Sequence, residues 1–152
     1  MIRQFRPEDS HPCRDLIHEC IRSDRLLSSD VRDALLGAET AETIRERSTL
    51  YYLVVDERDG EITAVGGVDM NEVRLLFVAP AHQGQGIGHA LLDHLEDMVP
   101  PALFREVFVY AAPASEPFYR RCGYRSRGPH PFEAHSVVIE TIFMVKPLDP
   151  PL

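Results

Sequence analysis

The sequence has few cysteines and no long apolar segment. Its three cysteines, Cys13, Cys20 and Cys122, are an odd number without C-x-x-C spacing, so they predict neither a disulfide framework nor a metal site. No apolar stretch approaches the roughly 18 residues that a membrane span requires. The first residues lack the apolar region of a secretory signal. We therefore expect a soluble cytoplasmic protein with reduced thiols and no membrane partner.

Basic residues are in the minority as well. The chain has 16 Lys and Arg residues against 24 Asp and Glu residues, which gives a net charge of -8. Nucleic-acid binding needs an excess of basic side chains on one face, so we expect no nucleic-acid partner. An acidic surface suits a cationic substrate such as an amine, although the same charge also favours solubility. The 152 residues suffice for one domain, which we predict over residues 1–148 with a short tail at 149–152.

Apolar spacing predicts an alternation of helices and strands along the chain. The predicted helices cover residues 12–21, 30–47 with a weak point at Gly37, 86–99 and 115–121. The predicted strands cover residues 2–5, 50–55, 62–68, 72–78, 107–111 and 136–145. Asp59-Gly60 predicts a hairpin turn. The strand, helix and strand between Glu72 and Ala111 predict one right-handed parallel crossover, which places the fold in the mixed α/β and α+β classes.

A glycine-rich turn, Gln83-Gly84-Gln85-Gly86-Ile87-Gly88, separates one predicted strand from the next predicted helix. N–H groups at the start of a helix lack partners within it, and glycines allow positive φ and the close approach of a phosphate. Charge-assisted hydrogen bonds of about 1.5–3 kcal/mol each outweigh the roughly 0.3–1 kcal/mol of the helix dipole. The dinucleotide fingerprint needs glycine where His89 stands, and the Lys-Ser/Thr ending of a P-loop is absent. The turn therefore predicts a site for another phosphate-bearing ligand, with a purely structural turn as the alternative.

Two segments carry a family resemblance. Val78 to Gly88, followed by Ala90-Leu91-Leu92, resembles the signature of the GNAT superfamily of acyl-CoA N-acyltransferases. Pro117 to Tyr124 is similar to the F-Y-x-x-x-G-F/Y element of that family. The resemblance extends over residues 1–148 and implies a GNAT fold. In that fold a mixed central sheet of about six to seven strands has one parallel strand–helix–strand crossover and flanking helices.

The resemblance also implies an enzyme and a donor. It implies an N-acetyltransferase that passes an acetyl group from acetyl-CoA to a primary amine by direct attack in a ternary complex, without a metal. The coenzyme A pyrophosphate is expected on the amides of the glycine-rich turn, and the pantetheine arm along the main chain of the preceding strand. That arrangement requires an open edge between the strands ending at Val78 and Ala111. The implied cofactor-binding residues are Phe77, Val78, Gln83, Gly84, Gln85, Gly86, Ile87, Gly88, His89 and Ser115.

Two residues are candidates for the proton transfers. Tyr119 matches the family tyrosine that protonates the departing thiolate, and a phenol with a pKa near ~10 carries the needed proton at neutral pH. Its alternative role is packing between helix and sheet. Glu72 matches the glutamate base of one branch of the family, and strand alternation puts it on one face with Arg74, Leu76 and Val78. A Glu72–Arg74 ion pair, or a base formed by Asp69 with an ordered water, are the alternatives.

The acceptor side of the site is less defined by the sequence. We expect a small-molecule amine, with protein N-termini or lysines as the alternative. Glu133 and His135 precede the last predicted strand, where they are either acceptor-site or surface residues. Ala112 stands where many members carry asparagine, which keeps a non-catalytic acyl-CoA-binding module open as an alternative. Arg120 and Arg121 are candidates for contacting the 3′-phosphate, and a homodimer is common in such folds although no residue marks an interface.

Overall fold

The computed structural model describes residues 1–149, so residues 150–152 of the predicted tail lie outside the described residues. The helices are α1 (Ser10–Ser23), α2 (Ser29–Ala38), α3 (Ala41–Leu50), α4 (Ile87–Asp97) and α5 (Glu116–Arg121), with 3-10 turns η1 (Pro7–Asp9), η2 (Pro80–His82) and η3 (Pro113–Ser115). The strands are β1 (Ile2–Gln4), β2 (Tyr52–Arg58), β3 (Glu61–Asp69), β4 (Glu72–Val78), β5 (Glu106–Ala111), β6 (Arg125–Pro129), β7 (Phe132–Ala134), β8 (Val137–Ile139) and β9 (Ile142–Pro147). No helix within residues 1–149 has the length and apolar character needed to cross a membrane.

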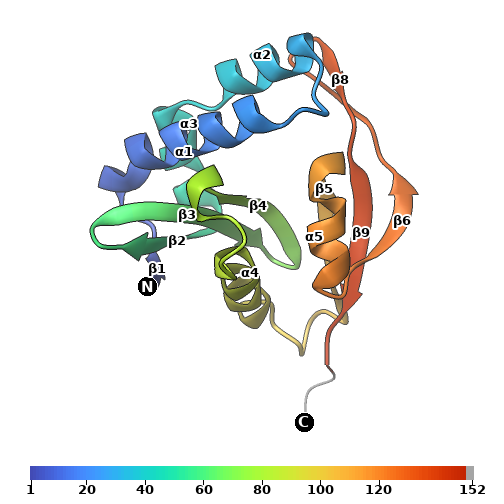
Figure 1. Cartoon of the computed structure of the whole chain (residues 1–152). Helices are drawn as coiled ribbons and strands as arrows, with labels where there is room; N and C mark the ends of the chain where they lie inside the picture. Colours follow the sequence, from blue (N-terminus) through green and yellow to red (C-terminus); the bar gives the residue numbers. More distant parts are fainter. Residues whose placement is uncertain (150–152) are drawn as a thin grey trace.

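Seven of the strands form a mixed sheet, as predicted, and their order in it is β1-β2-β3-β4-β5-β9-β6 (Figure 1). All neighbouring strands of this sheet pair in antiparallel fashion except β4 and β5, which are parallel and are linked through α4. The remaining strands, β7 and β8, form a separate hairpin between β6 and β9. This β7–β8 hairpin contacts α2 and so connects the end of the chain to its first helices (Figure 1).

Most predicted elements are confirmed. The predicted strand 72–78 has the same bounds as β4, and the predicted helix 30–47 is divided after Gly37 into α2 and α3. Thr40 starts α3 by accepting a hydrogen bond from the N–H of Thr43 at 3.0 Å. The single predicted strand at 136–145 is wrong, because this segment contains β8 and the first part of β9, which Glu140 and Thr141 separate. The preceding strands β6 and β7 were not predicted, because they are short and mostly exposed and so carry little apolar pattern.

Each face of the sheet has its own hydrophobic core. On one face α4 and α5 cover a core that includes Leu91, Leu95, Val107 and Tyr119. On the other face α1 and α3 cover Ile17, Ile44, Val55 and Val65. The side chains of this second core come from the first half of the chain, so α1 and α3 leave the β5–β9–β6 half of that face to the β7–β8 hairpin.

A bulge interrupts the side-chain alternation of β4. Gly67 lies opposite Leu75, but the next residue, Val68, lies opposite Val73, so Arg74 is an extra residue on β4. Val73 is therefore buried on the α4 side together with Leu76 and Val78. The expectation that Glu72 and Arg74 share a face with Leu76 and Val78 is wrong, because uniform alternation assumes a strand without a bulge. The guanidinium of Arg74 instead lies over the ring of Tyr51 at 5.3 Å, on the α1 and α3 side.

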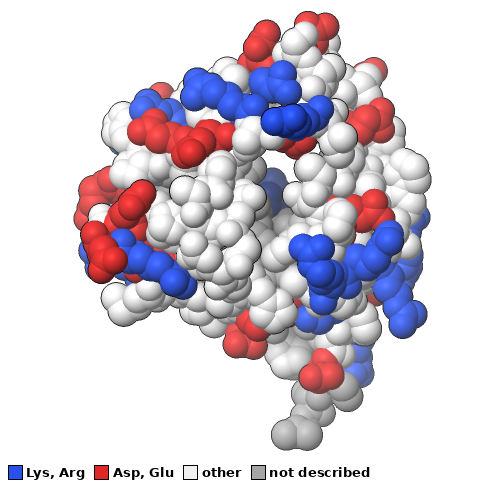
Figure 2. Space-filling model, in the orientation of Figure 1, with Lys and Arg blue, Asp and Glu red and all other residues white. Residues whose placement is uncertain are grey.

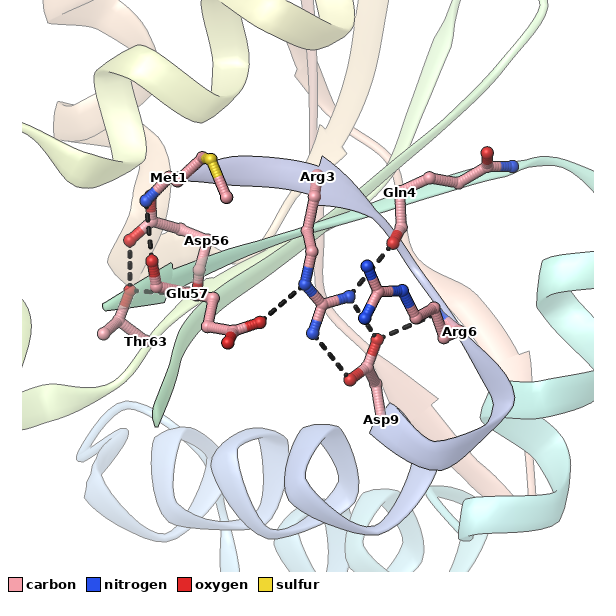
Figure 3. Close-up of polar contacts among 8 residues, drawn as sticks. All are labelled: Met1, Arg3, Gln4, Arg6, Asp9, Asp56, Glu57 and Thr63. Carbon is pink, nitrogen blue, oxygen red and sulfur yellow. Dashed lines mark hydrogen bonds and ion pairs between the residues drawn. The ribbon is translucent and has the colours of Figure 1, made fainter. Parts of the chain in front are cut away.

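A network of charged side chains fixes the first strand and turn to the sheet (Figure 3). Arg3 donates to both carboxylate oxygens of Asp9, at 2.8 and 3.0 Å, and to Glu57 at 2.6 Å. Asp9 also accepts from the N–H of Arg6 at 2.8 Å. Burial by itself raises the pKa of the Asp9 carboxyl, but the hydrogen bonds from Arg3 and Arg6 outweigh it, and the pKa lies below its ordinary value.

We expect this network to make the fold sensitive to acid. A carboxyl whose pKa is lower in the folded state stabilises the fold above its unfolded pKa of about 3.9, and this contribution is lost as the pH falls through the folded pKa. Asp9→Asn should lower the unfolding free energy at pH 7 by about 3 kcal/mol, because it leaves a buried charge partly unpaired. The difference from the unmodified protein should shrink below about pH 4 in denaturant titrations. Asp15→Asn is the matched control, since Asp15 pairs with Arg14 in an exposed position; equal losses in both variants would contradict the prediction.

Candidate active site

A wedge-shaped gap opens between β4 and β5. The two strands pair only at Glu72 with Phe108 and at Val73 with Val109, near the start of β4. Asn71 closes this end, because its side chain donates to the carbonyl of Glu106 at 3.0 Å and its own carbonyl accepts from Phe108 at 2.9 Å. Beyond Val73 no residue of β5 lies opposite β4. The open strand edge that the family resemblance implies for a pantetheine arm is therefore present.

The register with β3 shows which main-chain groups face the gap. Ala79 donates to Thr63 at 2.8 Å, so these residues form a hydrogen-bonded pair of the antiparallel ladder. Such pairs alternate with non-hydrogen-bonded pairs, so the next one inward joins Phe77 to Val65. The main-chain groups of Phe77 are directed at β3, so its expected place among the pantetheine-binding residues is wrong, whereas the main-chain groups of Leu76 and Val78 are directed into the gap. The carbonyl of Val78 already accepts from Gln83 Nε2 at 3.0 Å and from the Cys20 thiol at 3.1 Å, which leaves its N–H facing the gap.

The glycine-rich turn lies at the wide end of the gap. Gly84 and Gly86 have φ values of 78° and 81°, and Gly86 is the N-cap of α4. A Cβ at either glycine would meet no atom within 4 Å, so the space in front of the turn is open. Within residues 1–149, the N–H groups from Gly84 to His89 donate to no main-chain or side-chain acceptor. The side chain of Ile87 is buried and anchors the turn to the core.

Gly88 brings three elements together at this end. A Cβ at Gly88 would lie 3.2 Å from the ring of Phe118 on α5 and 3.3 Å from the side chain of Val78 on β4. The absence of a side chain thus lets α5 approach the start of α4 and the end of β4. The next residue, His89, has its ring 3.4 Å from Asp93 and 3.4 Å from the Cys122 thiol. The His89 side chain therefore contacts α4 and the end of α5, while its main-chain N–H continues the row of N–H groups in the turn.

Tyr119 lies on α5 and is 5% exposed. Its ring packs edge-on against Phe118 and Tyr124. Burial raises the pKa of the Tyr119 phenol, so the group stays protonated through the neutral range. Its hydroxyl makes no hydrogen bond within residues 1–149. The hydroxyl is nevertheless not fully buried, because Arg32 Nε is the one fully buried side-chain N or O atom in that range that lacks a partner. The packing interpretation of the ring and the proton-donor interpretation of the hydroxyl are therefore compatible.

The remaining residues near α5 have varied surroundings. Ser115 is the N-cap of α5 but forms no capping hydrogen bond, so its hydroxyl is uncommitted among the described residues. Arg120 pairs with Glu116 on the same helix, and Arg121 lies beside it in an exposed position. Ala112, at the end of β5, accepts the N–H of Ser115 at 2.8 Å through its carbonyl. No group of three or more His, Cys, Asp or Glu side chains in residues 1–149 is arranged to hold a metal ion.

A pocket of about 390 Å³ lies on the other side of the gap. Its walls are formed by Glu72, Val73, Arg74, Tyr110, Phe132 and Thr141. Glu72 accepts a long hydrogen bond of 3.4 Å from Arg74, and both side chains are partly accessible. Glu133 and His135 do not line this pocket, since they belong to the tip of the β7–β8 hairpin. Asp69 ends β3 opposite Glu72 and does not line it either.

Aromatic side chains form one wall of the pocket. The Tyr110 ring lies 4.7 Å from His130, 5.1 Å from Phe132 and 5.3 Å from Phe143. These rings come from β5, β9 and the segment around β7, so they fill the face of the sheet that the N-terminal helices leave uncovered. In the space-filling view a hollow separates the two halves of the molecule, and basic atoms are visible in its depth (Figure 2).

The structure places the two predicted proton-transfer residues on opposite faces of the sheet. Tyr119 belongs to the α4 and α5 side, and Glu72 to the pocket on the other side. The gap between β4 and β5 runs between these sides. Sequence reasoning missed Tyr110 and Asn71, and it treated Arg74 only as a partner of Glu72. A polar Asn71 at a hairpin turn and an arginine within an apolar strand were the available signals.

Comparisons with known proteins agree with this geometry. A family model described as an acetyltransferase (GNAT) domain matches residues 29–141. An "IAA acetyltransferase" of Azospirillum brasilense is 32% identical over 105 residues, which cover 62% of this chain and 67% of that protein. A GCN5-related N-acetyltransferase from Rhodopseudomonas palustris superposes with a TM-score of 0.90 at 18% identity, over 97% of this chain and 95% of the other. A phosphinothricin acetyltransferase from Sinorhizobium meliloti in complex with acetyl-CoA gives a TM-score of 0.66 at 23% identity, over 97% and 88% of the two chains.

Proposed function

Because the chain belongs to the GNAT acetyltransferase domain family, we propose that it transfers the acetyl group of acetyl-CoA to the primary amine of a small molecule. The enzyme class is that of acetyl-CoA-dependent N-acetyltransferases, and residues 1–148 act as one catalytic domain. The observation that carries the proposal is the row of unpaired N–H groups from Gly84 to His89 at the wide end of an open strand edge. Phosphate oxygens are acceptors that suit such a row.

The residues present fit coenzyme A. The open space before Gly84 and Gly86 allows a pyrophosphate to reach the main chain, and the Phe118–Gly88–Val78 contact forms the rim beside it. The N–H of Val78 and the carbonyl of Leu76 then hold the pantetheine arm, since these groups face the gap and lack strand partners there. Ser115 adds a hydroxyl and the N–H of His89 extends the row. Acetyl-CoA supplies an acetyl group as a thioester, whose sulfur leaves as the amide forms.

The size and setting of the pocket support a small acceptor. Its volume of about 390 Å³ lies within the range of small-molecule sites. The β7–β8 hairpin contacts α2 and places Phe132 of β7 in the wall of the pocket, so the acceptor would lie beside this hairpin. The relative from Azospirillum brasilense is named as an IAA acetyltransferase, which is also a small-molecule activity.

The residues on the two faces of the sheet then divide the proton transfers. An alkylammonium with a pKa of about 10.4 has to lose a proton before its nitrogen can attack, and Glu72 accepts that proton. The nitrogen forms a bond to the thioester carbonyl carbon, the carbon–sulfur bond breaks, and the Leu76 N–H donates to the carbonyl oxygen. Tyr119 gives its proton to the sulfur and regains one as the second nitrogen proton leaves. The sum is ammonium plus thioester to amide, thiol and one released proton.

A glycine substitution tests the donor site. Gly86→Ala should weaken coenzyme A binding in isothermal titration calorimetry at least tenfold, because alanine disfavours a φ of 81° and its methyl group enters the open space before the amides. Gly37→Ala is the matched control, since Gly37 has room for a methyl group inside α2 and no positive φ. Equal affinities of both variants would remove the turn from the donor site.

The acceptor class needs a separate assay. Thiol release from acetyl-CoA should be faster with free small amines than with peptides that present an N-terminus or a lysine. Mass spectrometry of the product should show one added acetyl group on nitrogen. Acetylation of peptides alone would overturn the small-molecule proposal and leave the donor site intact.

A further inference from the structure

Arg74 has more hydrogen-bonding capacity than its surroundings use. A guanidinium has five N–H donors, and the partners of Arg74 among residues 1–149 are Glu72, at 3.4 Å, and the side chain of Tyr51. Its side chain is 43% exposed, and it lines the pocket beside the gap. The neighbouring Arg47 differs, because two of its nitrogens are occupied by Glu39 at 2.6 and 2.9 Å. Arg74 is therefore the basic group of the pocket with donors to spare.

The local structure holds this guanidinium in place. The bulge at Arg74 directs the side chain away from α4, and the ring of Tyr51 lies beneath it at 5.3 Å. An arginine stacked on an aromatic ring presents a planar fork that matches a carboxylate in two parallel hydrogen bonds. Its present partner, Glu72, is partly exposed, and the distance of 3.4 Å between the two side chains is long for a hydrogen bond. An ion pair of this kind contributes little stability and opens easily.

We propose that the acceptor is an amino carboxylate with an apolar or aromatic side chain, whose carboxylate is bound by Arg74 while its amine lies at Glu72. This inference rests on the proposed acetyl transfer and specifies its acceptor. The Arg74 guanidinium and the Glu72 carboxylate lie 3.4 Å apart. The carboxylate and the ammonium of an α-amino acid are similarly close to each other, so each can pair with the protein group of opposite charge. Tyr110 and Phe132 form the apolar wall beside them, and Thr141 completes the lining. An amine without a carboxylate would leave the donors of Arg74 unsatisfied by the ligand.

Paired acceptors test the inference in one protein. L-Phenylalanine and 2-phenylethylamine differ by the carboxylate alone, so the ratio of their kcat/KM values reports on its recognition. The unmodified enzyme should favour the amino acid at least tenfold, and Arg74→Gln should reduce this ratio at least tenfold. A role of Arg74 in positioning Glu72 alone would reduce both rates equally. Because the ratio is taken within one sample, a partial loss of folded protein does not affect it.

Arg45→Gln removes an exposed arginine of α3 and should leave the ratio unchanged. The inference is overturned if the unmodified enzyme shows no preference for the carboxylate in this pair and in the matched pairs L-leucine with isoamylamine and L-tyrosine with tyramine. It is also overturned if Arg74→Gln leaves the ratio unchanged. A failure to bind acetyl-CoA or to acetylate any amine would instead contradict the proposed function itself.

Discussion

A Tyr119→Phe variant is expected to turn over about 100-fold more slowly than the unmodified enzyme, with an unchanged affinity for coenzyme A. The variant removes the hydroxyl that lacks a partner within residues 1–149 but keeps the ring that packs against Phe118 and Tyr124. The pKa of Tyr119 is raised by burial, so the lost group is a proton carrier at every pH near neutrality. Steady-state kinetics combined with calorimetric titration of coenzyme A would measure both quantities.

The matched control is Tyr52→Phe. The Tyr52 hydroxyl contacts His94 on α4 at 3.1 Å, and Tyr52 lies on β2, away from the gap between β4 and β5. The turnover of the Tyr52→Phe variant should therefore stay close to that of the unmodified enzyme. If both variants lose turnover to the same extent, the loss reflects the fold. If Tyr119→Phe keeps full turnover, the departing sulfur obtains its proton from water or from another group.

The second large effect is expected for Glu72→Gln. Only about one alkylamine molecule in a few thousand is neutral at pH 7, so losing the group that accepts the proton should reduce kcat/KM by about 100-fold. Raising the pH to about 9 increases the neutral fraction about 100-fold and should restore most of the lost rate. The measurement is the pH profile of kcat/KM for both proteins with one acceptor.

Glu61→Gln serves as the control, because Glu61 is an exposed glutamate at the start of β3. It should follow the unmodified profile. A parallel loss at all pH values in Glu72→Gln would assign Glu72 to binding or to its ion pair with Arg74. The base would then be Asp69 acting through water, or the acceptor would enter already neutral.

The parts of the site that the sequence predicts are those set by neighbouring residues. Glycines at positions 84 and 86 have positive φ, and the helix begins directly after them, so the local pattern suffices to place the amides. The bounds of β4 follow from its apolar run and from Pro80, which cannot continue a strand ladder. The open edge follows from the resemblance, and the register with β5 agrees with it.

The parts that the sequence did not predict depend on residues far apart in the chain. The bulge at Arg74 arises from the pairing of β4 with β3, and a strand read alone gives no sign of it. The side of the sheet on which Glu72 lies was therefore assigned incorrectly relative to Leu76 and Val78. Likewise β6 pairs with β9 across the β7–β8 hairpin, and its exposed residues show no alternation that would reveal a strand. The aromatic wall around Tyr110 combines residues from three such segments.

The bulge in β4 has a consequence for how this enzyme can evolve. In the proposed site, the donor is recognised through main-chain groups of Leu76, Val78 and the glycine-rich turn, which most substitutions leave in place. The proposed acceptor site uses the side chains of Glu72 and Arg74, at the bulge and on the opposite face of the same strand. One strand of seven residues thus carries two specificities that mutation can alter independently. Descendants of this chain can exchange one acceptor for another at positions 72 and 74 while they keep the same acetyl donor.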